Sequence, residues 1–195
     1  MKTLIPICLG LIAIVSLSSC ASNLGEHRYT KFKTKPDYKK TREIYRDETL
    51  LKTANPSNTK VKIDLGDQRA QMLVGDKVAL DLPCCTGKAG KRTPTGTFKI
   101  TKKIRTKRSN IFGSLYRGSR KVYGGDRRKY RGRYTRYVGS PLPYWMRLTD
   151  GGIGMHYSAY VHRYPGSNGC IRMPMDGVKT IFSKTKVGTP VQVTY

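Results

Sequence analysis

A mostly-β domain with a single short helix is the fold class that this sequence predicts for residues 61–195. Short runs in which apolar and polar residues alternate recur along this part of the chain, as half-buried strands require. Residues typical of turns separate these runs. Only one segment, Pro174–Lys184, spaces its apolar residues as an amphipathic helix does. A domain of about 135 residues is large enough for one hydrophobic core.

The first three strands are expected in quick succession. Val61, Ile63 and Leu65 alternate with polar residues and predict the strand that starts the domain. Ala70–Val74 and Val78–Leu82 predict two more strands. The connection between these two begins with a glycine, which suits the first position of a two-residue hairpin turn. They are therefore expected to pair as a hairpin.

The later strands are expected to be short. They are Thr97–Thr101, Pro143–Leu148, Ile153–Tyr157 and residues 191–195. In the predicted helix, Pro174 suits the first helical position, where a missing N–H costs nothing. Val178, Ile181 and Phe182 then form one apolar face along it.

The charge balance excludes a neutral cytosolic composition. Lys and Arg number 38 and Asp and Glu 12, so the formal net charge is +26 and the sequence pI is about 10.2. Such an excess points to an anionic partner, whether nucleic acid, acidic lipid or an acidic cell wall. The length of 195 residues allows one domain of ordinary size with extra segments. Five cysteines are too few for a disulfide scaffold.

The N-terminus has the features of an export signal. Lys2 precedes an apolar run, Leu4–Leu17, which is shorter than the ~18–20 residues that span a bilayer comfortably. Two serines and Cys20 follow, and the end of this run resembles the lipobox of bacterial lipoproteins. The resemblance implies removal of residues 1–19 and lipidation of Cys20, which would anchor an exported protein facing the periplasm or cell wall. A plain signal peptide with an incidental cysteine is the alternative.

Residues 20–60 are expected to form a flexible basic stalk behind the lipidated cysteine. They contain few aliphatic residues and show no sustained period of a helix or a strand. A short helix near Thr41–Lys52 is weakly indicated. Ala21 replaces the aspartate that often signals retention in the inner membrane, which favours the inner leaflet of the outer membrane if the organism has one.

A basic insert is expected at about residues 102–139 of the domain. Residues 102–136 contain fourteen Lys and Arg and a single acid, Asp126, with tyrosines and glycines between them. This composition does not build a core, so a surface loop is expected. The pattern resembles a nucleic-acid-binding tail, but an exported chain meets little nucleic acid, so none is expected as a partner. The loop is either solvated without a partner or binds anionic envelope polymers.

A candidate catalytic site lies just before the predicted helix. Cys170 stands where the helix N-terminus would favour a thiolate and supply N–H groups for an oxyanion. Gly169 allows the backbone to approach a substrate carbonyl closely. His156 ends a predicted strand and can act as a base. A cysteine with a histidine is the minimum for thiol acyl transfer, because the histidine takes the proton and the cysteine attacks.

The residues around this cysteine resemble the catalytic domain of the L,D-transpeptidases (YkuD-type). The resemblance rests on Ser167, Gly169, Cys170 and Arg172 at their spacing, with His156 upstream. Two further segments agree with it, Thr93–Ile100 and Pro143–Met146. It covers roughly residues 61–195 and implies a β-sandwich with one short helix after the catalytic cysteine.

The resemblance also implies roles for individual residues. Cys170 would be the nucleophile and His156 the general base and acid, with the main-chain carbonyl of Tyr157 orienting its ring. The Gly169 N–H would be part of the oxyanion hole. The substrates would be peptidoglycan stem peptides, joined in 3→3 cross-links or to a protein amine through a thioacyl-enzyme. No cofactor is expected, and no metal, since no residues have the spacing of metal ligands.

Five residues are candidates for substrate binding, namely Tyr144, Trp145, Ser167, Asn168 and Arg172. The chain departs from the family at two positions. Many members have histidine where Asn168 stands, and asparagine cannot change its charge. Many have a small residue after the catalytic histidine, whereas the bulky Tyr157 is expected to narrow the pocket.

Other readings of the sequence stay open. The chain is alternatively a non-catalytic lipoprotein that binds the wall or a polyanion, or a related L,D-carboxypeptidase with water as acceptor. His162 is a rival base without support from the motif. The adjacent Cys84 and Cys85 are expected to fill a strand end, with a redox role as the alternative.

Overall fold

The computed structural model describes residues 14–195, with side chains from residue 24 onward. Residues 1–13 of the expected signal peptide and the side chain of Cys20 lie outside this description. The chain divides into two compact units, Met1–Tyr38 and Lys39–Tyr195. Within the first unit, helix α1 covers Ile14–Lys33. No helix in the described part of the chain is both long and apolar enough to cross a membrane.

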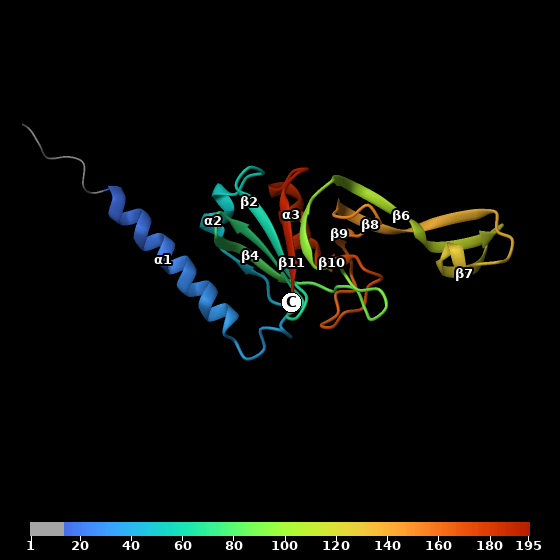
Figure 1. Cartoon of the computed structure of the whole chain (residues 1–195), viewed down its shortest axis with the longest axis horizontal. Coiled ribbons are helices and arrows are strands. Elements are labelled where there is room, and N and C mark those ends of the chain that lie inside the picture. The colour runs from blue at the N-terminus through green and yellow to red at the C-terminus, as the bar shows by residue number, and fades with distance from the viewer. Residues whose placement is uncertain (1–13) are drawn as a thin grey trace, which may run out of the picture. The chain divides into compact units, whose positions relative to one another are not determined.

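The second unit contains two β-sheets, as the sequence predicts for a mostly-β domain (Figure 1). The first has six strands in the order β1-β4-β3-β2-β11-β5. In this sheet β2, β3 and β4 form antiparallel pairs, and β11 lies parallel to β2. Its strands are β1 (Tyr45–Arg46), β2 (Thr59–Asp64), β3 (Arg69–Val74), β4 (Lys77–Pro83), β5 (Gly96–Lys99) and β11 (Pro190–Thr194).

The second sheet has five strands in the order β10-β9-β8-β6-β7. All of its neighbouring pairs are antiparallel except β10 with β9. Its strands are β6 (Lys102–Arg117), β7 (Arg120–Asp126), β8 (Arg136–Arg147), β9 (Gly154–Tyr157) and β10 (Ile171–Met173). A 3-10 turn, η1 (Arg127–Lys129), follows β7.

Helix α3 (Met175–Lys184) confirms the predicted helix and completes the core between the sheets. Its Val178 and Ile181 are fully buried. A side chain at Gly177 would place its Cβ 2.2 Å from Leu82 Cδ1, so this glycine lets α3 approach β4 closely. The core draws on the first sheet, the second sheet and α3, as a two-layer domain requires.

Residues 102–139, here called the basic ribbon, are not the surface loop that composition predicts. They form all of β6, β7 and η1 and the start of β8, and they extend the second sheet (Figure 1). Leu115 is fully buried. Gly113 and Gly139 pair across β6 and β8, and a Cβ on Gly113 would lie 2.3 Å from Val138 O. Backbone pairing and a few close contacts therefore order a segment that is rich in positively charged side chains.

Residues 20–60 also differ from the expected flexible stalk. Helix α1 covers part of this range, and its sequence has no apolar stripe that would reveal a helix. The second unit begins at Lys39 rather than near residue 61. In that unit β1 pairs with β4, and helix α2 (Glu48–Thr53) starts at Asp47, whose carboxylate accepts from the Leu50 N–H at 3.0 Å.

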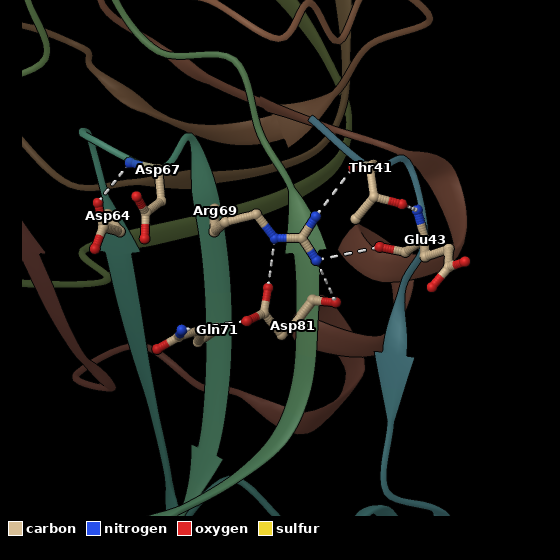
Figure 2. Close-up of polar contacts among 7 residues, drawn as sticks. All are labelled: Thr41, Glu43, Asp64, Asp67, Arg69, Gln71 and Asp81. Carbon is tan, nitrogen blue, oxygen red and sulfur yellow. Dashed lines mark hydrogen bonds and ion pairs between the residues drawn. The ribbon is translucent and has the colours of Figure 1, made fainter. Parts of the chain in front are cut away.

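A buried arginine holds the start of this unit against the first sheet (Figure 2). Arg69 Nε donates to Asp81 Oδ1 at 2.7 Å, and both side chains are almost completely buried. Its two other nitrogens donate to the carbonyls of Thr41 at 3.2 Å and Glu43 at 3.1 Å. Gln71 Nε2 donates to the second carboxylate oxygen of Asp81. The guanidinium therefore joins residues 41–43 to β3 and β4.

Candidate functional site

Two adjacent parallel strands bring the candidate catalytic residues together. In β9 and β10, His156 lies opposite Arg172 and Met155 opposite Ile171. Cys170 directly precedes β10. Extending this register by one residue places it beside Gly154. Side chains two residues apart on a strand share one face. Cys170 and His156 therefore lie on the same face of the sheet and line one cleft.

His156 is held as a neutral base. It is 4% exposed, and its Nδ1 lies 2.7 Å from the carbonyl oxygen of Tyr157. Because a carbonyl can only accept, Nδ1 carries the ring proton and Nε2 keeps its lone pair. Burial lowers the pKa of His156 to about 4, against the opposing effect of the bond to Tyr157 and with a small further lowering by Arg172.

Cys170 is held as a thiol. Burial raises the pKa of this group above its usual value. A backbone hydrogen bond with Gly154 and the positive charge of Arg172 act in the opposite direction on that pKa, since both stabilise a thiolate. No direct hydrogen bond joins the Cys170 thiol to the His156 ring in the described chain. The pair therefore rests as a neutral thiol and a neutral imidazole.

The loop before Cys170 is fixed by its own hydrogen bonds. Ser167 Oγ donates to the Cys170 carbonyl at 2.5 Å and accepts from the Gly169 N–H at 3.0 Å. The φ angle of Gly169 is +113°, a conformation that favours glycine. The Gly169 N–H, expected in an oxyanion hole, is thus engaged with Ser167 in this structure.

Thr93 supports this loop from the other side. Its Oγ1 accepts from the Gly87 N–H at 2.9 Å and donates to the Gly169 carbonyl at 2.8 Å. Lys88 N donates to the Ser167 carbonyl at 3.1 Å, so the segments around residues 87 and 167 run together. The role of Thr93 as a support for the cysteine loop is visible only in the structure, although its segment is part of the sequence motif.

Thr93→Val is expected to destabilise the fold by about 1–3 kcal/mol, because it leaves the buried Gly87 N–H and Gly169 carbonyl without their shared partner. Valine keeps the shape of threonine, so lost packing contributes little. Denaturant unfolding measures the change. Thr97→Val, at an exposed position of β5, is the matched control. Equal losses in the two variants would contradict the role given to Thr93.

The cleft has a volume of about 680 Å³. Besides Cys170 and His156, it is lined by four of the five candidate substrate-binding residues. These are Trp145, Ser167, Asn168 and Arg172. Ser167 is almost fully buried and Asn168 is exposed, so the loop presents Asn168 to solvent at the mouth of the cleft.

Tyr144 and Tyr157 do not line the cleft, which corrects two expectations. Tyr144 packs edge-on against Phe182 of α3, with ring centres 5.5 Å apart. Tyr157 packs against the core, so its bulk does not narrow the cleft. Both lie next to a cleft residue on a strand, and neighbouring side chains on a strand point to opposite faces.

The remaining candidates lie outside the cleft. His162 stacks on Tyr164, with ring centres 5.1 Å apart. Cys84 and Cys85 are fully buried and unpaired, and burial strongly raises the pKa of Cys84. Cys85 Sγ lies 3.5 Å from the Tyr164 carbonyl. Among the residues that the structure describes, no group of three or more His, Cys, Asp or Glu could hold a metal ion.

Comparison with known proteins agrees with this geometry. The family model of the L,D-transpeptidase catalytic domain (YkuD) matches residues 58–193, most of the chain. The chain belongs to this family. No curated protein matches the sequence.

Solved structures of L,D-transpeptidases share the fold of this YkuD domain. One from Mycobacterium smegmatis is 19% identical, with a TM-score of 0.55, over 71% of this chain and 59% of that one. One from Stackebrandtia nassauensis is 23% identical, with a TM-score of 0.53, over 74% and 60%. One from Enterococcus faecium is 26% identical, with a TM-score of 0.52, over 71% and 50%. This chain thus spans between 50% and 60% of these proteins.

Two features of the site in this YkuD domain were not predicted from the sequence. Gly154 hydrogen-bonds Cys170 through its backbone, and a Cβ there would lie 2.4 Å from the Met146 carbonyl. The second is the Ser167 bridge within the cysteine loop. The sequence shows a glycine, Gly154, two residues before His156. Only the strand register shows that this glycine lies beside Cys170.

The buried His156 is expected to make the fold less stable in acid. Its pKa is about 4 in the folded state and near 6.5 in an unfolded chain. Above pH 6.5 both states are neutral. As pH falls below 6.5 the unfolded chain takes up a proton that the folded chain does not, so the free energy of unfolding falls, by about 3 kcal/mol by pH 4.

Urea unfolding of the wild type and His156→Gln at several pH values between 7 and 4 measures this effect. The difference in unfolding free energy between the two proteins should change across the window, because the variant lacks the titrating group. Parallel curves would show that His156 is readily protonated in the folded state.

Proposed function

We propose that this chain is a cysteine-dependent L,D-transpeptidase acting on peptidoglycan stem peptides. The observation that carries the proposal is the arrangement of Cys170 and His156 on one face of β9 and β10, at a single cleft. Membership of the YkuD family supports the same reaction class. The thiol and the neutral imidazole are the protonation states from which acyl transfer starts.

In the acylation step, Cys170 Sγ attacks the carbonyl carbon of the third stem residue as its proton passes to His156 Nε2. A tetrahedral oxyanion forms, and the Cys170 N–H is our candidate donor to it. The bond to the terminal D-alanine then breaks, and His156 returns the proton to the leaving amine. A thioacyl-enzyme and free D-alanine result.

In the transfer step, the amine of a second stem or of a protein attacks the thioester carbonyl. Its proton passes to His156 and then to the departing Cys170 sulfur, which regenerates the thiol. The product is a 3→3 cross-link or a protein linked to the wall. Arg172, beside His156 on the neighbouring strand, is proposed to bind a substrate carboxylate.

The expected signal peptide suggests where in the cell the protein acts. We propose an exported lipoprotein, cleaved before Cys20 and anchored through lipid on that residue, whose domain faces the cell wall. The intact mass of the exported protein tests this, because loss of residues 1–19 and gain of acyl chains change it in opposite directions.

Incubation of the full-length protein with purified disaccharide-tetrapeptide, followed by mass spectrometry, tests the activity. A dimer lighter than two substrates by one D-alanine is expected. Release of tripeptide alone would make water the acceptor and the protein an L,D-carboxypeptidase. An unchanged substrate would favour a non-catalytic wall-binding protein.

A further inference from the structure

The basic ribbon carries a large excess of uncompensated positive charge. Of its fourteen Lys and Arg side chains, only Lys103 and Lys107 are half-buried, and the other twelve are exposed. Its one acid, Asp126, is paired with Arg128 at 2.7 Å. The ribbon therefore has the field of a polyanion-binding surface.

These charges are held on an ordered scaffold rather than on a mobile loop. β6 pairs with both β7 and β8. Arg136 stacks over the Tyr116 ring at 4.5 Å and Arg127 over Tyr137 at 4.9 Å. Side chains already fixed in this way lose less freedom on binding.

A row of aromatic rings lies among the charges. Tyr123 and Tyr130 stack with centres 5.3 Å apart, and Tyr134 lies 6.4 Å from Tyr130 and is 42% exposed. Tyrosine rings combine a flat apolar face with a hydroxyl group, which suits a sugar ring. Tyr134 is the only large hydrophobic residue of the described ribbon that is exposed, so the surface offers little for insertion into a membrane.

The ribbon and the candidate catalytic residues share one cleft. Lys107, Asn110 and Phe112 of β6 line it together with His156 and Cys170. A long molecule lying on the ribbon can therefore continue into the cleft without leaving the protein surface.

We propose that the basic ribbon binds polymeric peptidoglycan through the carboxylates of its stem peptides, with the tyrosine row against the sugars. A glycan strand held there presents neighbouring stem peptides to Cys170 at a high local concentration. This inference rests on the proposed function, because it takes the reactive stem and the bound polymer to be parts of one substrate.

The test uses the full-length Cys170→Ala protein, in which no reaction follows binding, and isolated peptidoglycan in a sedimentation assay. The ribbon variant replaces four exposed residues with glutamine: Arg120, Lys129, Arg131 and Arg133. A control variant removes the same charge from the sandwich, with glutamine at Lys52, Lys77, Lys99 and Lys179. The ribbon variant should bind at least about tenfold more weakly at low salt, with a shallower salt dependence, and the control variant should bind nearly normally.

A second readout uses the same substitutions with Cys170 intact. The ribbon variant should lose at least about tenfold more rate on polymeric peptidoglycan than on soluble disaccharide-tetrapeptide, because only the polymer reaches the ribbon and the cleft together. Equal binding by the ribbon and control variants would overturn the inference. So would tight, ribbon-dependent binding to anionic phospholipid vesicles that peptidoglycan does not compete. If the soluble substrate is not converted at all while ribbon-dependent binding persists, it is the proposed activity that fails.

Discussion

Cys170→Ala is expected to lower the rate of D-alanine release from disaccharide-tetrapeptide by about 10⁴-fold or more, because it removes the atom that forms the thioester. The substitution should cost little stability, since the side chain is only half-buried and its thiol contacts the Gly152 carbonyl through a long hydrogen bond of 3.9 Å. Liquid chromatography of released D-alanine gives the rate, and thermal unfolding shows that the variant is folded.

Cys84→Ala is the matched control for this prediction. Cys84 is fully buried in the core and burial strongly raises its pKa, so it cannot act as a nucleophile without unfolding. This variant should lose some stability and keep most of the activity per folded molecule. Retention of full activity by Cys170→Ala would remove the proposed mechanism, whatever the behaviour of Cys84→Ala.

Arg69→Met is expected to lower the free energy of unfolding by about 3–5 kcal/mol, because the fully buried Asp81 carboxylate would lose the guanidinium that compensates it. The same change frees the carbonyls of Thr41 and Glu43 (Figure 2). Urea denaturation measures the loss. The double variant with Asp81→Leu should recover part of it, because the buried carboxylate is then absent.

Lys60→Met is the control, because it removes an ion pair with the same separation at an exposed position. Lys60 Nζ lies 2.7 Å from Asp76, the same separation as in the buried pair, but the Asp76 side chain is 97% exposed. Water replaces the lost contact there, so the expected loss of stability is much smaller. Similar losses in Arg69→Met and Lys60→Met would show that burial does not decide the strength of these pairs.

The first sheet and α3 could be predicted because their apolar residues follow the period of the element. Val61, Ile63 and Ala70–Val74 alternate or cluster as buried strands do, and α3 shows a clear apolar face. The strands of the basic ribbon could not be predicted in this way, because they are ordered mainly by backbone pairing along β6. β1 has only two residues and gives no period at all.

The reactive residue types of the site could be predicted from the sequence, but the residues that position them could not. The spacing around Cys170 and the upstream His156 predicted a pair of residues that the structure brings to one cleft. The face on which a side chain lies depends on the strand register, so Tyr144 was expected in the cleft and lies against α3 instead. The hydroxyl of Thr93 bridges segments 76 residues apart, a contact that no local pattern predicts.

The guanidinium of Arg69 has a mechanical consequence for the second unit. It binds residues 41 and 43, just after the start of this unit at Lys39, and the short β1 follows at Tyr45. A tensile load applied through the N-terminal end of the chain reaches these bonds before it reaches the sandwich. The cleft lies on the second sheet, whereas the load enters through the first. The bonds of Arg69 and the pairing of β1 with β4 therefore take up such a load first.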